Sequence, residues 1–192
     1  MKMVLNMKQE LLFPDLETHH RPYAKAVNVA AVPQRSPFRY PGGKTWFVPT
    51  FRRWLASMPS RPRLLVEPFA GGGIISLTAL FEKLTQKVVM VERDEEIAAV
   101  WQSVVNGDTG WLADRILEFR LTKENVINEI NKHHDDIKHI AFRTILKNRT
   151  LHGGILAEGS SFIKYGENGK GIQSRWYPRT LATRFRNLDF VA

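Results

Sequence analysis

The architecture of this chain can be inferred most directly from one segment, Leu64-Leu65-Val66-Glu67-Pro68-Phe69-Ala70-Gly71-Gly72-Gly73. Its apolar beginning predicts a short strand, and its run of glycines predicts a tight turn. Residues 74 to 83 then have the apolar pattern of a helix. A glycine-rich turn between a strand and a helix lets the backbone approach a bound molecule closely, because glycine has no Cβ that would collide with it. We therefore expect a ligand-binding turn at residues 67 to 73.

A second strand and a second helix are predicted directly after the first pair. Residues 87 to 91 are mostly apolar and end at Glu92, and Asp94 can cap a helix that Gly107 ends. A strand, helix, strand, helix order is typical of a parallel sheet covered by helices, so the predicted fold class is α/β. Residues 46 to 56 are predicted to form a further helix before the first strand.

The flanking regions lack this alternation of strands and helices. Residues 1 to 36 mix prolines with charges and have no sustained periodicity, which predicts a loose N-terminal extension. Residues 111 to 149 have the helical spacing of apolar side chains. Further on, Asn168-Gly169 lies between short β-prone stretches and predicts a hairpin.

The chain has 28 lysines and arginines against 19 acidic residues, a formal net charge of +9. Such a charge favours a polyanionic partner through phosphate neutralisation, with an anionic membrane surface as the alternative. No apolar run of about 18 residues occurs and no export signal is recognisable at the start, so we expect neither membrane insertion nor secretion. The absence of cysteine is typical of a reducing cytoplasm. These properties together favour a cytoplasmic protein that binds nucleic acid.

Two acidic residues and the glycine spacing separate the candidate ligands. Gly71 and Gly73 match the first two glycines of a dinucleotide-binding turn, but Ser76 stands where the third glycine is expected. Glu92, about 20 residues beyond the turn, can accept hydrogen bonds from the ribose hydroxyls of an adenosine. Glu67 would repel a pyrophosphate but suits the cationic sulfonium of S-adenosylmethionine. Charge therefore favours S-adenosylmethionine over NAD, and the alternative is a plain tight turn with Glu92 as a helix-capping carboxylate.

Two motifs taken together resemble those of a known family. Arg39-Tyr40-Pro41-Gly42-Gly43-Lys44, followed by residues 66 to 73, is similar to the opening pair of motifs of the Dam-like, alpha-class adenine-N6-specific DNA methyltransferases. The resemblance implies an incomplete Rossmann-like sheet of S-adenosylmethionine-dependent methyltransferases, with a mostly helical, basic DNA-recognition region. It also implies that the S-adenosylmethionine pocket is formed by Tyr40, Lys44, Glu67, Phe69, Gly71, Gly73 and Glu92.

Later segments are similar to the DNA-recognition region of the same family. Leu146-Lys147-Asn148-Arg149 with Gly153-Gly154 resembles the segment that opens that region, and residues 174 to 181 resemble the segment that leads back to the sheet. Residues 142 to 188 also hold nine lysines and arginines against two glutamates, which favours phosphate contact over the alternative of a solvated basic face. Double-stranded DNA is the expected partner, with RNA as the alternative. The expected DNA contacts are Lys147, Asn148, Arg149, Lys164, Lys170 and Arg175.

The resemblance covers about residues 37 to 188 and implies four parts of the chain. Residues 1 to 36 form the extension and residues 37 to 110 the cofactor-binding part. Residues 111 to 180 form the target-recognition region, and residues 181 to 192 begin the return to the catalytic sheet.

The family's catalytic motif, Asp-Pro-Pro-Tyr, is absent from this sequence, which contains no Pro-Pro dipeptide. Enzymes of this kind extrude the target base and hold its poorly nucleophilic amino group in hydrogen bonds. No catalytic residue is therefore assigned. We expect a truncated site-specific DNA methyltransferase whose chain binds cofactor and DNA without turnover, with a restriction endonuclease as its partner in a restriction-modification system. The alternatives are a non-catalytic remnant and an NAD-dependent Rossmann oxidoreductase.

A histidine and aspartate cluster raises the question of a metal site. His133-His134, Asp135-Asp136 and His139 supply imidazole and carboxylate groups, which are good metal ligands. On a helix, however, His133 and His139 drift around the axis, so that at most one pair of ligands converges. A solvated polar face is therefore favoured, and no metal is expected.

Overall fold

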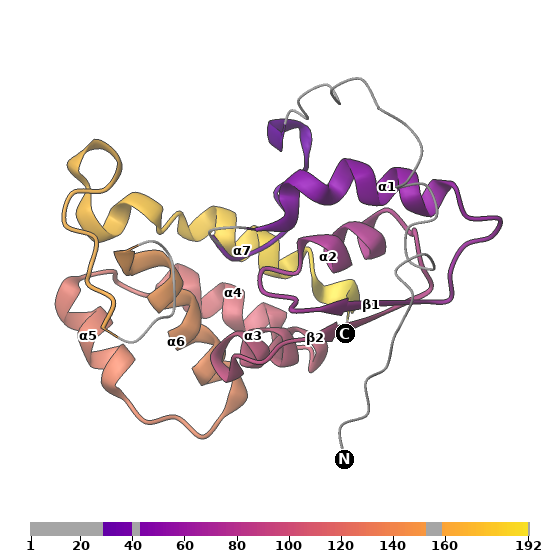
Figure 1. The fold of residues 1–192 in the computed structure, drawn as a ribbon. Helices are drawn as coiled ribbons and strands as arrows, with labels where there is room; N and C mark the ends of the chain where they lie inside the picture. Colours follow the sequence, from indigo (N-terminus) through magenta and orange to yellow (C-terminus); the bar gives the residue numbers. More distant parts are fainter. Residues whose placement is uncertain (1–28, 40–42, 153–158, 192) are drawn as a thin grey trace, which may run out of the picture.

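The computed structural model of this chain describes residues 29–39, 43–152 and 159–191. Predictions on Tyr40, on residues 1 to 28 and on Gly153-Gly154 lie outside these ranges. The described chain has a mixed α/β fold, in which many helices accompany a small parallel sheet (Figure 1). The α/β prediction is confirmed at this level, although two strands do not by themselves define a Rossmann-like methyltransferase sheet.

Two strands form the sheet, β1 (Leu64–Pro68) and β2 (Lys87–Val91). They pair in parallel along their whole length, so their carboxyl ends lie at the same edge of the sheet. The helix α2 (Ile74–Phe81) connects them, and α3 (Glu95–Val105) follows β2. The predicted order of strand, turn, helix, strand and helix is confirmed.

The beginnings of α2 and α3 follow from the local sequence. Gly73 precedes α2 in the left-handed conformation, with φ of 63°, which glycine adopts without steric cost. Asp94 caps α3, and its carboxylate accepts hydrogen bonds from the backbone N–H groups of Glu96 and Ile97. The helix cap that the sequence predicts is therefore confirmed.

A first hydrophobic core lies between the sheet and the helix α1 (Val48–Ala56), which follows the 3-10 turn η3 (Lys44–Phe47). Figure 1 shows α1 and α2 stacked on the same side of β1. The helix predicted for residues 46 to 56 is thus confirmed, with a 3-10 start. Buried side chains of this core come from α1 and α2, with partly buried contributions from the strands: Val48, Phe51, Leu55, Ile74, Ile75, Ala79, Leu65 and Val88.

Outside the sheet, the regular elements of the described residues are helices and 3-10 turns. The region predicted as helical, residues 111 to 149, contains α4 (Thr109–Glu118), α5 (Lys123–Asn131) and α6 (Ile137–Thr150). Near the end of the chain, α7 (Pro178–Arg186) packs against α4, while α6 packs against α3. In the described ranges, no helix is long and apolar enough to cross a membrane.

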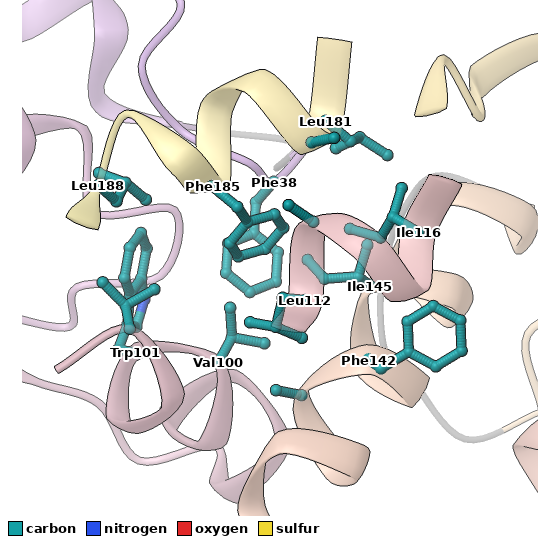
Figure 2. Close-up of a cluster of buried hydrophobic side chains, with 14 of the residues drawn as sticks. Phe38, Val100, Trp101, Leu112, Ile116, Phe142, Ile145, Leu181, Phe185 and Leu188 are labelled. Carbon is teal, nitrogen blue, oxygen red and sulfur yellow. The ribbon is translucent and has the colours of Figure 1, made fainter. Parts of the chain in front are cut away.

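A second and larger core joins distant parts of the chain (Figure 2). Phe38 from the N-terminal segment, Trp101 from α3, and Phe185 and Leu188 from the end of the chain are all buried in it. Burying one such side chain stabilises the fold by about 1.5–3 kcal/mol. This core therefore holds α7 and the segment around Phe38 firmly against α3 and α4.

Residues 29 to 36 are packed rather than loose. They begin with the 3-10 turn η2 (Val29–Ala31), and Val32 is only 2% exposed. Arg35 forms an ion pair with Glu82 at 2.8 Å and donates a hydrogen bond to Thr78 of α2 at 3.3 Å. These contacts with a distant helix have no signature in local periodicity, and the boundary at residue 36 stays a prediction.

The hairpin predicted at Asn168-Gly169 is also wrong. The structure has two 3-10 turns there, η5 (Glu167–Gly169) and η6 (Gly171–Arg175). Gly171 donates its N–H to the carbonyl of Tyr165 at 2.8 Å and closes a compact loop. An Asn-Gly pair suits any turn that needs positive φ, so it does not by itself specify a hairpin. A last 3-10 turn, η7 (Asp189–Val191), ends the described chain.

Candidate functional site

A cavity of about 790 Å³ opens where β1 and β2 end. Its walls come from residues of the segment 34–45, from the turn at residues 69 to 74 with Glu92, and from the end of α6 and the region of α7. Ligand sites in α/β proteins commonly lie at the carboxyl ends of parallel strands. Five of the seven predicted cofactor residues line this cavity: Lys44, Phe69, Gly71, Gly73 and Glu92.

Glu92 fixes the glycine turn from the end of β2. One of its carboxylate oxygens accepts the N–H of Gly71 at 2.6 Å, and the other accepts the N–H groups of Arg93 and Asp94 at 2.8 and 3.0 Å. On the other side, the indole N–H of Trp101 donates to the carbonyl of Gly71 at 2.9 Å. A carboxylate oxygen has two lone pairs, so the Glu92 oxygen bound to Gly71 can also accept a hydroxyl from a ligand.

A side chain at Gly73 would collide with the core in this turn. A Cβ at this position would lie 2.6 Å from Cε of Met90 and 2.8 Å from Cζ2 of Trp101. The same turn holds Phe69 at φ of 56°, which is unfavourable for a residue with a side chain. The Phe69 ring is 80% exposed and lines the cavity. Strained backbone and an exposed aromatic ring are typical of a functional turn.

Glu67 lies behind the cavity rather than in its wall. Its side chain is 4% exposed, and one oxygen lies 2.7 Å from the ammonium of Lys44. The other oxygen accepts the N–H and the hydroxyl of Ser76 at 2.8 and 2.6 Å. Lys44 also donates to the carbonyl of Phe69 at 2.7 Å. The charge of Glu67 is therefore paired with that of Lys44, and Glu67 anchors the turn, while its contact with a cationic ligand stays a prediction.

Arginines line the wall opposite the glycine turn: Arg39, Arg149, Arg175 and Arg184. Arg184 donates to the carbonyl of Ser36 at 2.9 Å, and burial together with the charge of Arg39 lowers the pKa of Arg184. The sequence analysis missed Arg39 and Arg184 as site residues. Arg39 is the first residue of the motif that contains Tyr40, which is the one local indication of its position.

Arg149 is the most deeply buried of these arginines. It is 3% exposed, and it donates to the carbonyls of Pro37 and, at 3.4 Å, Arg175. Burial, and then the charges of Arg184, Arg39 and Arg175, lower the pKa of Arg149 to about 9. The Arg149 side chain therefore still carries its positive charge at pH 7.

Two other residues predicted to contact DNA hold the fold together. Asn148 is buried, and its side-chain amide accepts the N–H of Arg39 at 2.9 Å and donates to the Arg39 carbonyl at 3.0 Å. Lys147 lies 2.6 Å from the carboxylate of Glu96 in α3. These side chains are held by intramolecular contacts, and the DNA contacts at Lys147 and Asn148 stay a prediction.

The remaining predicted DNA contacts are accessible. Lys164 and Lys170 are exposed on the loop around η5, and Arg175 lines the cavity. Glu167 links this loop to the cavity rim, because it accepts the Tyr177 hydroxyl at 2.8 Å. The structure thus brings the lysine-bearing loop next to the arginine wall.

The histidine cluster lies between α5 and the first turn of α6. His139 lies 3.1 Å from Asp136, and the rings of His134 and His139 stack at 5.3 Å. Among residues 29–39, 43–152 and 159–191, no group of three or more histidine, aspartate or glutamate side chains is placed to hold a metal ion.

No protein-family model matches this sequence, and no curated protein shows significant similarity to it. The fold and the site define the class only as an α/β protein with a ligand cavity at the carboxyl ends of two parallel strands.

Proposed function

We propose that this chain is the cofactor-binding and DNA-binding part of an adenine-N6 DNA methyltransferase. The observation that carries the proposal is the meeting of two separate motifs in one cavity. Lys44 from the first motif, the turn at residues 69 to 74 from the second, and Glu92 at the end of β2 all contribute to its wall. A cavity of about 790 Å³ is also within the range of small-molecule sites.

S-adenosylmethionine would be held by its adenosine half. Glu92 would accept the ribose hydroxyls, and the exposed ring of Phe69 would provide apolar contact. Gly71 lines the cavity and has no Cβ, so its backbone leaves room for the methionine half. Four arginines of the opposite wall supply positive charge, and one of them suffices for the carboxylate of that half.

The reaction itself would be a direct methyl transfer. When bound, S-adenosylmethionine would supply an electrophilic methyl group: adenine N6 would accept it and lose one proton to water, and the cofactor would leave as the neutral thioether. The groups that activate N6 in such enzymes belong to the Asp-Pro-Pro-Tyr motif, which these 192 residues lack. This chain therefore supplies binding and orientation in the proposal, and no catalytic residue is assigned to it.

The proposal is tested by photo-crosslinking S-adenosylmethionine with a tritiated methyl group to the protein. Label is expected on the peptide with the turn at residues 69 to 74, and S-adenosylhomocysteine should displace it. Glu92→Gln should reduce labelling on the order of tenfold, since hydrogen bonds to a charged group are worth about 1.5–3 kcal/mol. Glu95→Gln is the matched control, because Glu95 is exposed nearby but does not line the cavity. Equal labelling of both variants would contradict the proposal.

Transfer to DNA is tested with the whole gene product. Expressed in cells without adenine methylation, it should produce N6-methyladenine that nucleoside mass spectrometry detects in the DNA. Binding of S-adenosylmethionine with unmethylated DNA would instead support a non-catalytic remnant.

One observation favours a second candidate, an NAD-dependent oxidoreductase. Glu67 is neutralised by Lys44 and no longer argues against a pyrophosphate, and four arginines line the cavity. Ser76, in place of the third glycine of a dinucleotide turn, argues the other way. Displacement of the crosslinked label by NAD, with none by S-adenosylhomocysteine, would select this candidate.

A further inference from the structure

The charge of the cavity is strongly unbalanced. Its lining includes five cationic side chains, and Glu92 is the only carboxylate among the described residues that line it. Glu67 compensates Lys44 from behind the wall. Of the four arginines, only Arg39 forms an ion pair with a carboxylate of the described residues, that of Glu167 at 3.5 Å. S-adenosylmethionine, itself a cation at sulfur, needs only one arginine for its carboxylate. The proposed cofactor therefore leaves most of this charge unexplained.

Some N–H donors of the wall formed by Arg39, Arg149, Arg175 and Arg184 have no acceptor among the described residues. Nε of Arg149 is buried and has no hydrogen-bond partner in the part of the chain that the structure describes. The guanidinium of Arg175 likewise makes no hydrogen bond to any described residue, although its backbone carbonyl accepts one from Arg149. Leaving a buried charged donor unpaired is costly. A bound anion would remove this cost and the mutual repulsion of the guanidinium groups.

We propose that Arg39, Arg149, Arg175 and Arg184 form a phosphate-binding subsite in this cavity, and that its occupant is a backbone phosphate of a nucleic acid. Guanidinium groups suit phosphate because their N–H groups match its oxygens in pairs. Several arginines on one wall exceed the need of a carboxylate but match a phosphodiester with its neighbouring phosphates. The identity of the polymer rests on the proposed function. The assignment of phosphate as the bound group rests on the arginines alone.

The surroundings favour a polymer over a free nucleotide. The loop around η5 carries exposed Lys164, Tyr165 and Lys170. It is tied to the rim of the cavity through Glu167, which contacts Arg39 at 3.5 Å and Tyr177 at 2.8 Å. A nucleic-acid strand that extends out of the subsite can contact this basic loop. A free nucleotide has no neighbouring phosphates that could reach the loop.

At the rim of the cavity, Glu167 places a carboxylate beside Arg39, where the proposed phosphate would otherwise bind. The hydrogen bond from Tyr177, with Arg39 beside it, keeps the pKa of Glu167 below its ordinary value, so the carboxylate is charged at neutral pH. Tyr177 itself lines the cavity at φ of 37°, a strained conformation for a residue with a side chain. In the phosphate-bound state, Arg39 would exchange this exposed carboxylate for a phosphate oxygen.

The test compares two variants that lose the same charge. Arg175→Gln removes a guanidinium that no described residue binds, so the fold should be retained, as circular dichroism can verify. Arg179→Gln is the control, because Arg179 is exposed in α7 and does not line the cavity. The affinity for a fluorescent mixed-sequence DNA duplex is measured by anisotropy over a series of salt concentrations, and S-adenosylhomocysteine affinity is measured in parallel.

Arg175→Gln should weaken DNA binding about tenfold and reduce the salt slope by about one, while Arg179→Gln changes the affinity less than about twofold. S-adenosylhomocysteine affinity should stay unchanged in both variants. Equal loss of DNA affinity in the two variants would overturn the subsite. Loss of S-adenosylhomocysteine affinity in Arg175→Gln, with DNA binding intact, would overturn it in favour of the cofactor carboxylate.

Two further outcomes separate the possible sources of failure. Tight binding of ATP that depends on Arg175, without DNA binding, would overturn the nucleic-acid occupant. Arg175-dependent DNA binding by a protein that does not bind S-adenosylhomocysteine would support the subsite and contradict the proposed function.

Discussion

Gly73 shows how a single residue determines the shape of the cavity. Its positive φ turns the chain from β1 into α2, and its missing side chain leaves room for Met90 and Trp101. Trp101 in turn holds the carbonyl of Gly71. The glycine requirement therefore links the ligand turn directly to the hydrophobic core.

Replacing Gly73 by alanine is expected to lower the free energy of unfolding by about 1–3 kcal/mol, because a Cβ collides with two core side chains at a positive φ. Urea unfolding measures the change. Gly110→Ala is the control, since a Cβ there meets nothing within 4 Å and α4 gains a better helix former. Equal destabilisation by the two substitutions would contradict the role of Gly73.

At the residue scale, the sequence predicts local roles better than distant ones. The Asp94 cap and the glycine turn depend on neighbouring residues, and both predictions are confirmed. The pairing of Glu67 with Lys44 depends on how the chain folds back, so the sequence indicated a carboxylate free to meet a ligand. The burial of Asn148 and Arg149 was missed for the same reason.

At the element scale, one ion-pair network joins the N-terminal segment to the helices of the first core. Glu82, directly after α2, lies 2.8 Å from Arg35 and 2.5 Å from Arg52 of α1. The hydrogen bond from Arg52, and then that from Arg35, lower the pKa of Glu82. This network positions the segment that forms one wall of the cavity.

Glu82→Gln is expected to remove an acid-sensitive part of the stability. Because the folded-state pKa of Glu82 is lowered, its contribution is present above about pH 4.5 and is lost as the pH falls through the folded pKa. The variant should lose about 1 kcal/mol at pH 7, since the network is partly exposed, and less at pH 3. Thermal unfolding between these pH values measures the difference, with Glu118→Gln as an exposed control. Parallel curves for Glu82→Gln and the wild type would contradict the role of this network.

Elements with strong local patterns were predicted closely, and the others were not. β1, α2, β2 and α3 follow apolar periodicity and caps, and their predicted bounds agree with the structure to within a few residues. The packed segment at residues 29 to 36 and the 3-10 turns around Asn168 are stabilised by contacts that a local pattern does not encode.

At the scale of the whole molecule, the two cores and the cavity are coupled. The larger core brings α7 and Phe38 together with α3 (Figure 2). It thereby places arginines opposite the glycine turn. The face of the sheet away from α2 is open, and Leu64, Val66, Val89 and Val91 are each about half exposed on it. The sheet is therefore covered on one face only within the described residues.

Phosphate should stabilise the whole protein if the arginine wall binds it. Millimolar inorganic phosphate is expected to raise the melting temperature by about 3 °C over chloride at equal ionic strength, because a ligand of the folded state shifts the unfolding equilibrium. Arg175→Gln should lose most of this rise. A rise that is equal in the variant would show a general salt effect instead.

The most direct test of the account is a calorimetric titration of the protein with S-adenosylhomocysteine, repeated with NAD. We predict saturable one-to-one binding of S-adenosylhomocysteine, weakened at least about tenfold by Glu92→Gln and unaffected by Glu95→Gln, with no heat from NAD. Saturable binding of NAD without any binding of S-adenosylhomocysteine would contradict the account.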